Sequence, residues 1–204
     1  MPDDPWNILL DILPGSLIGG AVMVAGAFMG WWMTRGRRGW LLQCTTWWFD
    51  RVVRPVLTTR SWAARAAIIA ANNSLVCAAL VVAGALGYVA WLAILLVGLA
   101  LGTALRLVAE VADTFEPEPA LTLRQRIGAG VGIVLNLLEP PAILASIGLA
   151  LAQGALADSL ALPAAGEFYI RFVLPILVVA AAGEALWLTI YGIHIDRSGQ
   201  TATR

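Results

Sequence analysis

The feature that most constrains the fold of this sequence is a run of 40 residues, 66–105, without a single charged side chain. As one helix this run would be about 60 Å long, twice the ~30 Å hydrocarbon core of a membrane. The run must therefore fold back on itself. Gly87 favours a turn near its centre, and the nearby Trp91 is typical of a membrane interface. The sequence predicts a hairpin of two membrane-spanning helices, near 66–86 and 89–108.

Three other segments are long and apolar enough to cross a membrane, which takes about 20 predominantly apolar residues. They are expected near 12–34, 127–152 and 172–195. The composition agrees, because 60% of the residues are hydrophobic and 13% are charged, against about 25% charged residues in soluble domains. We therefore predict an all-α, polytopic membrane helix bundle of five spans, with residues 1–204 forming one integral-membrane domain.

The positions of the basic residues predict the orientation of this bundle. All thirteen are arginines, and five spans place twelve of them on one side, with Arg171 on the other. Short loops rich in basic residues are retained in the cytoplasm. We therefore expect a protein of the inner membrane with its N-terminus outside and its C-terminus in the cytoplasm. Residues 1–6 carry no basic residue, so we expect that the first apolar segment is not a cleaved signal peptide.

The linker at 40–62 alternates aromatic and basic side chains at helical spacing. The residues concerned are Trp40, Trp47, Trp48, Arg51 and Arg54. This pattern predicts an amphipathic helix in the membrane interface, with its arginines toward anionic lipid headgroups. A helix that docks a partner protein is the alternative. We expect no nucleic-acid partner, because the formal net charge is zero and no recognition motif accompanies the basic residues.

Two glutamates, Glu139 and Glu184, lie near the middle of their predicted spans. A charge at this depth costs at least ~2.5–3.5 kcal/mol, and no arginine lies deep enough to pair with either. Desolvation therefore favours the neutral carboxylic acid. The expected hydrogen-bond partners are the other carboxyl or the amides of Asn72, Asn73 and Asn136. Two roles remain open: hydrogen bonding that holds helices together, or a proton, cation or substrate pathway.

Pro140 and Pro141 follow Glu139 directly and predict a break in the fourth span. Each proline lacks a backbone donor, so carbonyls in the preceding turn are left without a helical partner. An ordinary kink is one outcome. The other is a re-entrant pair of half-helices, which would reverse the direction of the last helix.

Glycine pairs spaced by four residues recur along the spans, a pattern that lets helix backbones approach closely. The pairs are Gly15 and Gly19, Gly26 and Gly30, Gly98 and Gly102, and Gly128 and Gly132. They predict close packing within the bundle or, alternatively, a homo-oligomer.

No motif of a known catalytic site is present in the sequence. His194 is the only histidine, and Cys44 and Cys77 are the only cysteines, so neither a histidine-based metal site nor a catalytic triad can be assembled. We expect no enzyme activity, no metal and no cofactor.

Several fragments, taken in order, resemble the stage II sporulation protein M family of small polytopic membrane proteins. They are Asn72-Asn73, Gly98-Leu99-Ala100-Leu101-Gly102, Glu139-Pro140-Pro141-Ala142 and Gly183-Glu184-Ala185, and the similarity extends over about residues 66–195. The resemblance implies a non-enzymatic membrane scaffold that recruits or anchors other membrane or envelope proteins.

Two functions are therefore carried forward from the sequence. The first is an inner-membrane scaffold or complex subunit, in which Glu139 and Glu184 act as packing hydrogen-bond groups. The alternative is a small proton- or cation-coupled transporter or channel that uses the same two carboxyls.

Overall fold

The computed structural model describes residues 5–34, 40–112, 122–154 and 160–191, and no strand occurs in these ranges. Five helical units are long and apolar enough to cross a membrane. They are α1 (Pro5–Met33), α4 (Trp62–Gly84), α5 (Val89–Ala112), α6 with α7 (Leu123–Asn136 and Glu139–Ala152), and α8 with η3 and α9 (Leu162–Phe168, Tyr169–Val173 and Leu174–Ile190). The predicted all-α, multi-pass membrane fold is confirmed.

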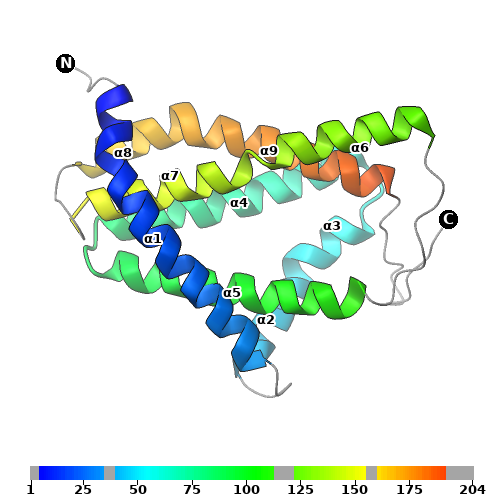
Figure 1. The fold of residues 1–204 in the computed structure, drawn as a ribbon, viewed down its shortest axis with the longest axis horizontal. Helices are drawn as coiled ribbons and strands as arrows, with labels where there is room; N and C mark the ends of the chain where they lie inside the picture. The colour runs from blue at the N-terminus through cyan, green and yellow to red at the C-terminus, as the bar shows by residue number, and fades with distance from the viewer. Residues whose placement is uncertain (1–4, 35–39, 113–121, 155–159, 192–204) are drawn as a thin grey trace.

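Three of the units lie side by side along the long axis of the molecule: α4, α6–α7 and α8–α9 (Figure 1). Helix α1 crosses obliquely and packs on α5 and α7. The start of α1, the α4–α5 turn and the end of α7 lie at one end of the bundle. The start of α6 and the ends of α5 and α9 lie at the opposite end (Figure 1). The connections therefore alternate between the two ends as five successive spans require. From α2 (Trp40–Trp48), below the middle of α5, the linker leads through α3 (Arg54–Thr58) to the start of α4 (Figure 1). We call the end that holds the starts of α4 and α6 the linker end.

Glycines bring the backbones of neighbouring helices into contact. A methyl group added to Gly98 in α5 would collide with the carbonyl of Met23 in α1, and one added to Gly102 would collide with that of Ala27. Further glycines of the predicted pairs also face a neighbouring helix of the same chain: Gly15, Gly19, Gly26, Gly30 and Gly132. The four-residue glycine spacing is therefore used within the bundle, so contacts between copies of the chain would need other surfaces.

The predicted hairpin turns at Gly87. Helix α4 ends at Gly84 and α5 begins at Val89, and Gly87 between them has φ +61°. A side chain is strained in this left-handed region, which glycine enters freely. The predicted boundaries, 66–86 and 89–108, are close to the observed ones.

Two helices begin before the spans that the sequence analysis expected. Helix α1 begins at Pro5 rather than near residue 12, and α8 begins at Leu162, ten residues before the predicted 172. The prediction began each span where the uncharged run begins. Charged side chains such as Asp11 and Glu167 are tolerated in helices when they are exposed near a helix end, and both are exposed here. The last residues of the predicted span 172–195 lie outside the described ranges.

The linker is helical, as predicted, but it consists of three pieces. Helix α2 (Trp40–Trp48) leads into the π-helical turn η2 (Phe49–Val53) and the short helix α3 (Arg54–Thr58). Val56 of α3 is 6% exposed and belongs to an apolar cluster with Ile69 of α4 and Leu188 of α9. This part of the linker is thus packed into the bundle, whereas an interfacial helix would turn its apolar face to lipid.

Candidate intramembrane carboxyl site

The fourth span is interrupted between α6 and α7, where the double proline predicts a break. Leu137 and Leu138 form a turn between the two helices, and Pro140 and Pro141 occupy the first turn of α7. Both turn residues keep right-handed helical dihedral angles. The chain therefore continues in the same general direction, and α6 and α7 follow one another across the molecule (Figure 1). The span is kinked, and the re-entrant alternative does not apply.

Glu139 lies at this kink and is connected to α4 by hydrogen bonds. The Asn73 Nδ2 donates to Glu139 Oε1 at 3.0 Å, and the Asn72 Nδ2 donates to Asn73 Oδ1 at 3.1 Å. All three side chains are half-buried. Two of the three amides that the sequence analysis considered thus form a short relay that joins α7 to α4.

Glu184 approaches the same place from α9. It is half-buried, and its carboxyl lies close enough to that of Glu139 for the two to interact electrostatically. Within the described part of the chain, no hydrogen bond connects the two carboxyls, and none reaches Glu184. The structure therefore places the two glutamates near each other but gives a hydrogen-bond partner to Glu139 alone.

Asn136, the last residue of α6, lies beside the same stretch of α9. A methyl group added to Gly183, the neighbour of Glu184, would lie 3.0 Å from the Asn136 backbone nitrogen. The Asn136 Oδ1 is buried and has no hydrogen-bond partner among the described residues. A buried acceptor without a donor loses free energy. The kink thus gathers oxygen acceptors with few donors to satisfy them.

Residues that the sequence analysis did not single out continue this polar seam between α4 and α7. Cys77 and Ser146 are buried side chains of α4 and α7, and Cys77 is close enough to Glu139 to interact with it electrostatically. The Tyr169 hydroxyl donates to the Ser74 carbonyl at 2.7 Å. The spacing carried a signal, because Cys77 lies four residues after Asn73 and Ser146 seven after Glu139, each on one helical face.

Gln153 at the end of α7 was also missed. Its Nε2 donates to the carbonyls of Val81 at 2.8 Å and Leu149 at 3.0 Å, and its Oε1 is buried without a described partner. Gln153 therefore fastens α7 to α4 at the end of the bundle away from the linker.

Arg65, in the first turn of α4, is 3% exposed, although its sequence position suggested an arginine at the membrane surface. Its Nε donates to the Thr59 carbonyl at 2.5 Å and its Nη2 to the Leu57 carbonyl at 3.5 Å. Its Nη1 donates to Thr189 Oγ1 of α9 at 3.5 Å. This guanidinium therefore joins the linker, α4 and α9.

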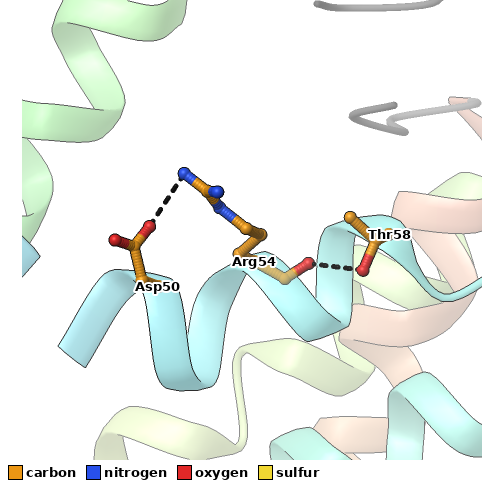
Figure 2. A network of polar contacts seen from close by, with 3 residues as sticks. All are labelled: Asp50, Arg54 and Thr58. Atoms are coloured by element: carbon orange, nitrogen blue, oxygen red, sulfur yellow. Dashed lines mark hydrogen bonds and ion pairs between the residues drawn. The ribbon is translucent and has the colours of Figure 1, made fainter. Parts of the chain in front are cut away.

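The interface residues of the linker form contacts with one another along the linker. The Arg51 guanidinium lies 5.4 Å from the centre of the Trp47 ring, a cation–π geometry. The Arg54 Nη2 pairs with Asp50 Oδ1 at 2.8 Å, and Thr58 Oγ1 donates to the Arg54 carbonyl at 2.9 Å (Figure 2). Such exposed pairs contribute little to stability.

The exposure of these residues varies along the linker. Trp47 is 62% exposed, Arg51 and Arg54 are exposed, and Trp48 is half-buried. The side chain of Trp40 lies outside the described part of the structure. Exposed tryptophan and arginine side chains on one short segment are typical of a membrane interface.

Two further findings concern metal binding and similarity to known proteins. The described residues contain no group of three or more His, Cys, Asp or Glu side chains that could hold a metal ion. No family model, curated protein or solved structure matches the chain. A carboxyl inside a helix bundle can take part in hydrogen bonds and can bind a proton or a cation.

Proposed function

We propose that the protein is an integral inner-membrane scaffold or complex subunit that recruits or anchors other membrane or envelope proteins. The observation that carries this proposal is the hydrogen bond from Asn73 to Glu139, because it uses the costly mid-membrane carboxyl to join two helices. A carboxyl that hydrogen-bonds to a neighbouring helix favours a structural role. The resemblance to the stage II sporulation protein M family supports the same reading, and the proposed role is non-enzymatic.

The proposed scaffold has its N-terminus outside and its C-terminus in the cytoplasm, with the linker end facing the cytoplasm. The support is the distribution of arginine. Arg51, Arg54 and Arg60 of the linker and Arg124 and Arg126 of α6 are exposed at this end. Membrane lipid is its immediate partner, and any homo-oligomer would form through surfaces other than the glycine pairs packed inside the bundle.

The scaffold proposal is tested by comparing Glu139→Gln with Glu139→Ala in cells. Gln keeps an acceptor for Asn73, whereas Ala does not. Proximity labelling around the protein should therefore give the same set of neighbouring envelope proteins for the parent and Glu139→Gln. Loss of those neighbours in a normally folded Glu139→Gln variant would contradict the structural role.

A second function, proton- or cation-coupled transport, is favoured by one specific observation. The Asn136 Oδ1, three residues before Glu139, is buried without a hydrogen-bond donor among the described residues, and a proton or cation could satisfy such an acceptor. Proteoliposomes carrying a pH gradient or a sodium gradient separate the two functions. Transport requires a flux that Glu139→Gln and Glu184→Gln abolish and that Glu167→Gln, at an exposed glutamate, leaves unchanged. An absence of flux in the parent protein would reject transport and leave the scaffold role as the one remaining proposal.

A further inference from the structure

The segment of residues 54–59, which we call the strap, packs against α4 and shares an apolar cluster with α4 and α9. Val56 of the strap packs in one cluster with Ala181, Ala185 and Leu188 of α9. Glu184 precedes Ala185 and lies one turn from both Ala181 and Leu188, so it shares this side of α9. The strap therefore packs near the side of α9 that carries Glu184.

Arg65 fastens the strap to the bundle. It donates to two strap carbonyls, those of Leu57 and Thr59, and to the hydroxyl of Thr189 on α9. The Thr189 hydroxyl in turn donates to the Ala185 carbonyl at 2.7 Å. A single side chain thus connects the strap to the turn of α9 that carries Glu184.

Few interactions within the strap stabilise its own conformation. Helix α3 has five residues, and Thr59 after it is extended, with ψ 126°. Val56 is buried, Leu57 is half-buried, and Arg54 points away to pair with Asp50 (Figure 2). A short helix is marginal by itself, so tertiary contacts must hold it in place. The Arg65 hydrogen bonds and the packing of Val56 and Leu57 on the apolar cluster are contacts of this kind.

We propose that the strap is a movable cover, fastened by Arg65, that separates Glu184 from the aqueous phase at the linker end. This inference deepens the second proposed function, since it describes how the carboxyl site would be closed toward one side of the membrane. Arg65 is a positioning residue in this scheme, because it acts on access to Glu184 through the strap.

The test measures access to a thiol placed at the carboxyl position. In a Cys44→Ser, Cys77→Ser background, Glu184→Cys is labelled in vesicles with a small, membrane-impermeant methanethiosulfonate applied from the linker end. We expect slow labelling when Arg65 is intact. Arg65→Met should speed it by about tenfold or more, the change for an opening equilibrium shifted by ~1.4 kcal/mol. Arg65→Lys should be intermediate, because lysine keeps the charge but not the planar fork of donors.

Arg60→Met is the matched control, because Arg60 is an exposed arginine in the same connection. It should leave the labelling rate unchanged. Val56→Ala loosens the cover without touching Arg65, so it tests the strap even if Arg65→Met does not fold. Equal rates in the parent and in a folded Val56→Ala variant would overturn the proposal, as would labelling that is faster from the opposite end.

The outcome for the strap is distinguishable from the outcome for transport. Faster labelling in Val56→Ala without any flux in proteoliposomes would support the strap as a cover and reject the transport function. A glutamate-dependent flux with unchanged labelling would keep the second function and reject the cover.

Discussion

The hydrogen bond between Asn73 and Glu139 gives the sharpest prediction for stability. Glu139→Ala removes the acceptor and leaves the Asn73 amide without its partner, which costs about 1–3 kcal/mol in protein interiors. Interhelical hydrogen bonds in membranes average nearer ~0.6 kcal/mol and reach ~1.7, because a helix separated in lipid also finds partners. Since both side chains are only half-buried, we expect a loss of about 1–2 kcal/mol.

Glu139→Gln should cost less than about 0.5 kcal/mol, because its amide oxygen can accept from Asn73. The measurement is the free energy of unfolding in mixed micelles, titrated with a denaturing detergent. A double-mutant cycle of Glu139→Ala with Asn73→Ala should give a coupling energy of about 0.6–1.7 kcal/mol. Glu167→Ala is the control, since it breaks an exposed pair with Arg171 and should change stability by less than about 1 kcal/mol.

Two results would refute this reasoning. If Glu139→Gln destabilises the bundle as much as Glu139→Ala, the acceptor for Asn73 is not what matters. If the coupling energy is zero within error, the observed hydrogen bond contributes nothing to stability, and the main support for the structural role is lost.

Three other predictions concern packing and topology. Gly102→Ala should destabilise the α1–α5 contact by about 1–3 kcal/mol in the same titration, whereas Gly130→Ala, whose new methyl group meets no atom within 4 Å, should be near neutral. Equal effects would show that the close approach is not required. Gly87→Ala should cost about 1–2 kcal/mol because of its φ of +61°, and an unchanged unfolding free energy would indicate that the turn readjusts. A reporter fused after Trp62 should read cytoplasmic and one inserted between α7 and α8 should read external; a cytoplasmic signal from the second reporter would contradict the proposed orientation.

The number of spans, the hairpin and the kink could be predicted because each depends on a local rule. A membrane-crossing helix needs about 20 apolar residues, so the uncharged runs limit the count. Gly87 supplies a conformation that other residues avoid, and the double proline removes two adjacent donors. The true starts of α1 and α8 were missed, because exposed charges such as Asp11 do not end a helix.

The partners within the site could not be predicted, because they depend on how the helices pack. The sequence offered three asparagines as hydrogen-bond partners for Glu139. Asn73 is the partner because of the way α4 is rotated against α7. The linker shows the same limit. Its aromatic and basic pattern is compatible both with a membrane surface and with packing on the bundle. Val56 packs on the bundle because α4 and α9 present an apolar face there.

The prolines of this chain show how far a local rule predicts whether a helix continues, widens or breaks. Both π-helical turns precede a proline in similar sequences, Phe-Asp-Arg-Val-Val-Arg-Pro at 49–55 and Tyr-Ile-Arg-Phe-Val-Leu-Pro at 169–175. In the second, the Leu174 N–H donates to the Tyr169 carbonyl five residues back, so the helix widens by one residue where the proline donor is missing.

Not every proline has this effect, because Pro14 lies inside the uninterrupted helix α1. One missing donor therefore leaves the backbone two choices, to continue as in α1 or to widen before Pro175, and the surrounding helices decide between them. Two adjacent missing donors, at Pro140 and Pro141, remove two successive rungs of the ladder, and there α6 and α7 separate. The separation falls one residue before Glu139, so the same two prolines that break the helix also fix the depth at which its carboxyl meets α4 and α9.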